Sequence, residues 1–120
     1  MRKVVRICDK DYSMKSSAYT QFKYKNDTGR RLLDDIQRIS EITSLPEEEQ
    51  AGKMEEVIEL LLRLAYVMIE EADKTQVSTF DEFLKGIDGL FDNTEWINEV
   101  VDLAISPISR GIQTHSPLEQ

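Results

Sequence analysis

The chain has few of the residues that cross-link or interrupt a fold. Its 120 residues include one Cys, one His, three Pro and five Gly. A single Cys excludes an internal disulfide framework and fits a reducing compartment, for which the cytoplasm is the default. The low Pro and Gly content argues against a largely disordered chain. At this length we expect one domain that folds around its own hydrophobic core.

Long apolar runs are also missing. The longest, LLLRLAYVMI at residues 60–69, contains Arg63 and has about half the length of a membrane span. The start MRKVVRICDKD has no apolar stretch of signal-peptide length, so nothing in it directs the chain out of the cell. We therefore expect no membrane partner and interpret residues 60–69 as part of a buried helix.

Charge is divided unevenly within the net value of −8 at pH 7. Residues 1–38, the basic head, hold ten Lys or Arg and five Asp, a balance of +5. Residues 39–120, the acidic body, hold five Lys or Arg and eighteen Asp or Glu, a balance of −13. Head and body are expected to meet within one molecule or between copies, unless both are simply solvated faces. The negative body disfavours binding to duplex DNA.

The hydrophobic pattern predicts a mainly α (α+β) fold, with an N-terminal β-hairpin followed by a bundle of about four to five helices. The alternation in KVVRICDKDYSMK predicts a hairpin over residues 3–15 that turns near residues 9–10, with Val5 and Ile7 facing Tyr12 and Met14. Because this turn lacks Gly, either a tight primed turn is strained or the loop is longer. Helices are predicted at about residues 17–28, 30–42, 46–74, 79–90 and 93–105. Residues 1–105 form the expected domain, and residues 106–120, with two Pro, are predicted to be a flexible tail.

Capping signals and helical periodicity locate the first three helices. Ser16 or Ser17 caps the first, which ends at Gly29 and has Tyr19 and Phe22 on one face. The second turns Leu32, Ile36 and Ile39 inward, and we expect its charged residues to face solvent: Arg30, Arg31, Asp34, Asp35 and Arg38. The third begins at a capping box, Ser44 to Glu47, and is apolar on most sides, which makes it the central helix, although Gly52 weakens its first turn.

The stretch TFDEFLKGIDGLFDNTEW at residues 79–96 carries three of the four Phe and the only Trp among five acids. After a capping box at Thr79, the spacing predicts that Phe80, Phe83, Leu84 and Ile87 pack into the core. Phe91 and Trp96 fall at the turn between two helices, where burial is less assured. We predict that they contact a partner, with a core position as the alternative for Trp96.

Residues with catalytic potential are sparse. His115 lies in the predicted tail, and Cys8 lies in the hairpin with no His nearby in the sequence. The chain has no glycine-rich phosphate loop and no Cys and His spacing typical of zinc sites. Asp88, Asp92 and Glu95 do not follow the order of a calcium-binding loop. We expect a protein that is not an enzyme, with no cofactor, no metal and no small-molecule substrate.

The order of these segments resembles the tail assembly chaperones of long-tailed bacteriophages and prophages of Gram-positive bacteria. The residues that carry the resemblance are the hairpin leading into ICDKDYSMKSSAYTQFKYKNDTGRRLLDDI, the helix LLLRLAYVMIEEADKT, and STFDEFLKGIDGLF with a Trp-bearing helix after it. It spans about residues 3–105. In this family the hairpin usually turns on Gly, whereas Cys8 and Asp9 stand at that place here.

The resemblance implies a small, mainly helical protein of the bacterial host cytoplasm that is not an enzyme. Such a protein coats the tape measure protein and helps recruit tail tube subunits, so we expect these two partners and a homo-oligomer, and no nucleic acid. A longer product made by frameshifting is common in the family. Within this chain we predict that Arg30, Arg31, Phe91 and Trp96 face partners, with ordinary solvation as the alternative for the two Arg.

Two other classes compete with this interpretation. The charge of the body suggests an acidic inhibitor that mimics nucleic acid and blocks a DNA-binding enzyme, although its acids are spread along helices without phosphate-like regularity. The basic head also fits a decoy poorly. The other rival is an enzyme subunit whose active site is completed by a partner.

Overall fold

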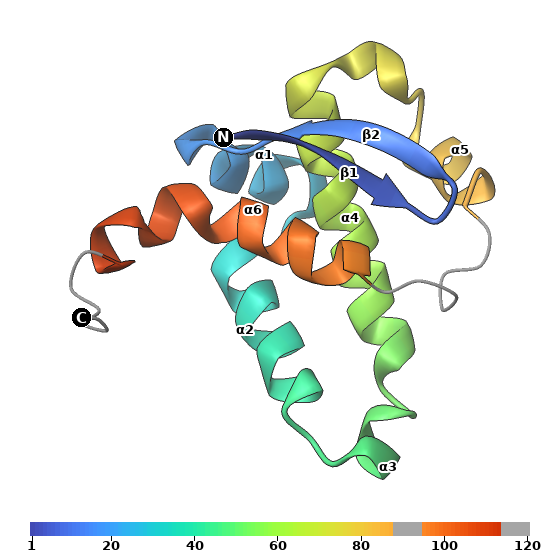
Figure 1. Cartoon of the computed structure of the whole chain (residues 1–120), viewed down its shortest axis with the longest axis vertical. Coiled ribbons are helices and arrows are strands. Elements are labelled where there is room, and N and C mark those ends of the chain that lie inside the picture. The colour runs from blue at the N-terminus through green and yellow to red at the C-terminus, as the bar shows by residue number, and fades with distance from the viewer. Residues whose placement is uncertain (88–94, 114–120) are drawn as a thin grey trace.

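The computed structural model describes residues 1–87 and 95–113, and it has the predicted mainly α architecture behind an N-terminal hairpin (Figure 1). The elements in chain order are β1 (Arg2–Ile7), β2 (Lys10–Lys15), α1 (Ala18–Thr28), α2 (Leu32–Thr43), α3 (Glu47–Gln50), α4 (Met54–Ala72), the 3-10 helix η1 (Lys74–Gln76), α5 (Phe80–Lys85) and α6 (Glu95–Gln113). The predicted turn that carries Phe91 lies outside the described residues.

The hairpin forms as the alternation predicts. β1 and β2 pair antiparallel with Val5 opposite Tyr12, and Val5, Ile7, Tyr12 and Met14 are all buried. This apolar face lies across α4, with α6 running beside β1 (Figure 1). The opposite face carries polar side chains except for Val4, which is 61% exposed. The sheet is therefore stabilised by one face only, as expected for two strands that cannot stand alone.

The turn is tight and lies one residue earlier than predicted. Ile7 pairs with Lys10, so Cys8 and Asp9 are the two central residues. Cys8 has φ 59° and is the one described residue other than Gly with a positive φ. Positive φ at the first central position alone is the pattern of a type II′ turn, which favours Gly there. The strained alternative for this turn is therefore the one that the chain adopts.

Helix α4 is the centre of the molecule, as its apolar pattern predicts. Ten of its residues are buried, on nearly all sides: Val57, Ile58, Leu60, Leu61, Leu62, Leu64, Ala65, Val67, Met68 and Ile69. Glu71 near its end accepts hydrogen bonds from the hydroxyls of Ser17 and Thr20, both at 2.6 Å, which ties the start of α1 to α4.

The prediction of one helix over residues 46–74 is wrong. The chain forms the short helix α3, makes turns at residues 51–53, and begins α4 at Met54. Gly52 lies inside this break, where its conformational freedom disfavours a continuous helix. The predicted capping box also fails, because Ser44 ends α2 and its Oγ donates to the carbonyl of Ser40 at 2.8 Å.

The last two helices differ from prediction at their ends. Thr79 caps α5 as predicted, accepting from the Glu82 N–H at 3.1 Å, but Gly86 ends the helix, earlier than the predicted residue 90. Helix α6 does not end before Pro107 but continues to Gln113, so the predicted tail begins as helix. Ile108, just past this proline, packs against the core, and that contact compensates for the hydrogen bond that Pro removes.

Candidate protein-binding surface

Helices α1 and α2 form a pair whose two sides have different chemistry. Ser17, one of the two predicted caps, caps α1 in a capping box with Thr20, and the helix ends at the predicted Gly29, which has φ 75°. Gly29 supplies the left-handed residue that lets the chain reverse into α2. The pair therefore has a short, well-defined turn that carries Arg30 and Arg31.

The inner side of the pair contains a buried polar network. The Tyr24 hydroxyl donates to Asp35 Oδ2 at 2.6 Å, and Arg30 binds the same carboxylate through Nε at 2.9 and 3.0 Å and through a terminal nitrogen at 2.8 Å. Tyr24 is fully buried and Asp35 is 2% exposed. Burial, and then the hydrogen bond with Asp35, raise the pKa of Tyr24 well above its usual range.

The position of Asp35 corrects the expectation that it faces solvent. A buried carboxylate is tolerated because it receives a forked arginine and a hydroxyl donor, which replace its lost hydration. Its two partners come from α1 and from the α1–α2 turn, so the network fixes how the helices meet. The hydrophobic periodicity of α2 alone does not indicate that Tyr24 and Arg30 bind Asp35.

The outer side of the pair is open and exposes apolar side chains. Phe22 is 66% exposed and Leu33 is 49% exposed, although the adjacent Leu32 is 3% exposed. A groove of about 410 Å³, here called the α1–α2 groove, is lined by Gln21, Phe22, Lys25, Arg31, Leu32, Leu33 and Asp34. Lys25 and Arg31 make no ion pair with any described residue. Exposed apolar side chains beside unpaired cations suit binding of a protein segment.

The four predicted partner-facing residues have different outcomes. Arg31 lines the α1–α2 groove, whereas Arg30 lies next to it with its guanidinium held by Asp35 and its side chain 52% exposed. Phe91 lies outside the described residues. Trp96 is 1% exposed, so the expectation that it faces a partner is wrong for this structure and the core alternative holds.

Trp96 is buried because it begins the inner stripe of α6. That stripe runs through Trp96, Val100, Leu103 and Ala104, steps of four, three and one that fit one helical face. The sequence places the stripe at Ile97, Val100, Val101 and Ala104, and both Ile97 and Val101 are only partly buried. The stripe is therefore rotated from the predicted one, and Trp96 moves inside.

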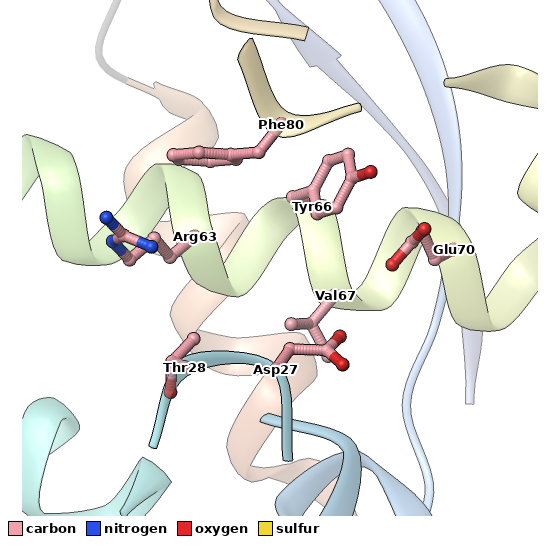
Figure 2. A pocket seen from close by; sticks show the side chains of 7 residues that line it. All are labelled: Asp27, Thr28, Arg63, Tyr66, Val67, Glu70 and Phe80. Carbon is pink, nitrogen blue, oxygen red and sulfur yellow. The ribbon is translucent and has the colours of Figure 1, made fainter. Parts of the chain in front are cut away.

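A second hollow lies between the end of α1, α4 and the start of α5 (Figure 2). It measures about 280 Å³ and is lined by Asp27, Thr28, Arg63, Tyr66, Val67, Glu70 and Phe80. Phe80 lies over α4 between Arg63 and Tyr66, with the Arg63 guanidinium 4.9 Å from the Phe80 ring centre (Figure 2). Its charged groups already have partners, which makes it a weaker candidate than the α1–α2 groove.

The two acids of this hollow, Asp27 and Glu70, share one lysine. Lys23 binds Asp27 at 2.8 Å and Glu70 at 3.1 Å. Burial acts to lower the pKa of Lys23, but the hydrogen bonds to Asp27 and Glu70 outweigh it and raise the pKa overall. Lys23 thus stays charged and holds α1 against α4.

Besides the contact of Arg38 with Glu41 at 3.9 Å inside α2, head and body contact each other among the described residues at three ion pairs. These join Lys3 to Glu99 at 3.1 Å, Lys23 to Glu70 at 3.1 Å, and Arg38 to Glu56 at 2.8 Å. The Lys3 and Arg38 pairs are partly exposed and contribute little to stability. Several head cations, including Lys25 and Arg31, have no such partner among the described residues.

Other features of the described residues give no second site. Within residues 1–87 and 95–113, no three His, Cys, Asp or Glu side chains are grouped closely enough to hold a metal ion. In the same part of the chain, no helix has the length and apolar character required to cross a bilayer. Comparisons with protein-family models, curated proteins and solved structures give no match to this chain.

Phe22 and Leu33 are the surface residues that sequence reasoning missed. Both belong to apolar patterns, and Leu33 adjoins a residue that is truly buried. A sequence signal for the exposure of Phe22 is present in α1, where Thr20 and Tyr24, four residues apart, form the buried stripe. That stripe turns Tyr19 and Phe22 toward solvent.

Proposed function

We propose that this chain is a tail assembly chaperone of a long-tailed bacteriophage or prophage, with no enzymatic activity. It acts in the cytoplasm of the bacterial host, where it binds the tape measure protein and helps recruit tail tube subunits. The proposal rests on the resemblance in segment order and on one structural observation, the open α1–α2 groove.

The α1–α2 groove suits one kind of occupant. Phe22 and Leu33 offer apolar contact, and Lys25 and Arg31 flank them with two unpaired positive charges, which exceed the single carboxylate of Asp34. An amphipathic helix with an apolar ridge and acidic residues beside it complements both features. A tape measure protein is long and helical, so it offers many such ridges that need cover before the tube forms.

Assembly on a long partner also requires many copies. The unpaired cations of the head and the exposed acids of α3, Glu47 to Glu49, favour contact between copies. We expect self-association that weakens with added salt. Sedimentation that shows only monomer at a concentration of about 100 μM and low ionic strength would contradict it, since charge contacts are least screened under these conditions.

The acidic inhibitor proposal receives no comparable support. Several body acids are occupied by groups of the same chain: Glu56 by Arg38, Glu70 by Lys23, and Glu71 by two hydroxyls. A mimic of nucleic acid needs long rows of free carboxylates, whereas the exposed row Glu47 to Glu49 of α3 is three residues long. Purified protein mixed with a nuclease at low and high salt separates the two proposals, because only a decoy inhibits, and only at low salt.

The direct test is capture of the tape measure protein of the same genome. Phe22→Ser should weaken capture at least tenfold, because it removes the largest exposed apolar side chain of the α1–α2 groove. Tyr19→Ser is the matched control, since Tyr19 lies on the same helix, is 57% exposed and does not line the groove. Equal capture by both variants would contradict the proposed surface.

Gene order gives an independent test. A large heptad-rich gene just downstream and a tail tube gene just upstream would support the proposal. A neighbourhood of nuclease or restriction genes would instead support the inhibitor.

A further inference from the structure

The two edges of the hairpin expose different backbone groups. The Met1 amino group donates to the Ser16 carbonyl and the Ser16 N–H donates to the Met1 carbonyl, both at 2.8 Å. With the strand register, this pair fixes which residues hydrogen-bond across the hairpin and which do not. In an antiparallel pair, every second residue turns its N–H and C=O away from the partner strand. On β1 these residues are Arg2, Val4 and Arg6, and on β2 they are Asp11, Ser13 and Lys15.

The β2 edge is closed by a side chain. The Ser13 N–H donates to Gln76 Oε1 at 2.8 Å, and Gln76 Nε2 donates to the Ser13 carbonyl at 2.9 Å. These are the two bonds that a third strand would make with Ser13. Gln76 is positioned by η1, whose first turn is capped by Asp73. The amide therefore occupies the centre of this edge.

The β1 edge has no such cover. The outward backbone groups of Arg2, Val4 and Arg6 have no hydrogen-bond partner among the described residues. The Val4 side chain is 61% exposed. α6 runs beside β1 (Figure 1), and its Glu99 pairs with Lys3, whose backbone groups point toward β2. The helix borders the start of the edge, where Arg2 lines a hollow of about 140 Å³ with Asp102 and Ser106, but Val4 and Arg6 do not line this hollow. An uncovered edge of this kind is a template for another strand.

The side chains of the edge indicate what the added strand is. Pairing with a second β1 centred on Val4 would set Arg2 opposite Arg6 of the other copy at both ends, and like charges opposite each other are destabilising. The same two arginines attract carboxylates. Arg6 already contacts Asp11 at 3.1 Å in an exposed pair, so an added carboxylate shares Arg6 with Asp11.

We propose that the β1 edge binds an extended acidic segment of a partner protein by strand addition. An apolar residue of that segment lies opposite Val4, and carboxylates two residues to either side lie opposite Arg2 and Arg6. Backbone hydrogen bonds hold the added strand against β1. The two arginines favour acidic segments and disfavour pairing with a second β1. This inference does not depend on the proposed function or on the α1–α2 groove.

The test uses the full chain and a fluorescein-labelled blocked peptide, TETVTET, read by fluorescence anisotropy at low salt. TKTVTKT is the charge-reversed control and should bind at least tenfold more weakly. Val4→Pro removes the outward N–H that the hairpin does not use, so binding of TETVTET should also fall at least tenfold while the fold persists. Val4→Thr keeps that N–H and should bind the acidic peptide nearly as well as the parent chain.

A probe-side change keeps the test independent of protein folding. Methylation of the backbone nitrogen at the central Val of TETVTET removes its donor to the Val4 carbonyl and should abolish binding to the unchanged protein. Equal binding of the methylated and unmethylated peptides, or of the acidic and basic peptides, overturns the proposal. Absence of binding by TETVTET itself also overturns it.

Discussion

The two sides of the α1–α2 pair reverse the usual distribution of polar and apolar side chains. On the inner side the carboxylate of Asp35 is 2% exposed, and on the outer side Phe22 is 66% exposed. The buried charge has three donor groups around it, whereas the exposed aromatic lines an open groove. We conclude that the inner side maintains the fold and the outer side is available for a partner. The predictions below separate these roles.

The largest expected effect contrasts two aromatic residues, one buried and one exposed. Trp96→Ala should lower the free energy of unfolding by about 3–5 kcal/mol, because it leaves a cavity beside α4. Phe22→Ala should change it by less than about 0.5 kcal/mol. Urea unfolding followed by circular dichroism measures both. A small loss of unfolding free energy for Trp96→Ala would contradict the burial of Trp96.

The next effect tests the inner network. Asp35→Ala should cost about 2–3 kcal/mol of unfolding free energy, since it leaves the Tyr24 hydroxyl buried without an acceptor. The half-exposed Arg30 can return to water, which limits the loss. Asp35→Asn is the matched control, because its amide oxygen still accepts from Tyr24, and it should cost less. Equal losses for the two variants would show that the acceptor is unimportant.

A smaller effect follows from the titration of Tyr24. Burial and Asp35 raise its pKa in the folded protein, so the folded state holds this proton more tightly than the unfolded chain. That contribution is fully present below the unfolded pKa of about 10 and is lost as pH rises through the folded value. Stability should therefore fall above about pH 10, and Tyr24→Phe should make the fall less steep.

Urea midpoints at several pH values between about 8 and 11 measure this slope. Tyr12 and Tyr66 also have raised pKa values through burial, so the variant removes part of the slope and not all of it. An unchanged slope in Tyr24→Phe would mean that Tyr24 does not titrate differently in the two states.

Local patterns in the sequence predict most of the fold. Alternation identifies the buried face of the hairpin, apolar density identifies α4, and caps at Ser17, Gly29 and Thr79 locate helix ends. These signals act between residues that are near in the sequence, so a single segment is enough to read them.

The features that sequence reasoning misplaces depend on partners far along the chain. Asp35 is buried where it accepts hydrogen bonds from Tyr24 and Arg30. Helix α6 continues past Pro107, and Ile108 in this last part packs against the core. Leu32 and Leu33 are equally apolar, and only the packing of α2 against the rest decides which is exposed. The exposure of Leu33 helps to form the α1–α2 groove. Of the four residues predicted from the sequence to face a partner, only Arg31 lines this groove among the described residues.

The adjacent leucines give the most direct test of the central claim, because they have the same chemistry but Leu32 is 3% exposed and Leu33 is 49% exposed. Leu32→Ala should lower the free energy of unfolding by about 2–4 kcal/mol, whereas Leu33→Ala should change it by less than about 0.5 kcal/mol. Capture of the tape measure protein by folded Leu33→Ala should fall at least fivefold. A Leu33→Ala protein that is as stable as the parent and captures the partner equally well would contradict the claim that the outer side of the α1–α2 pair is the binding surface.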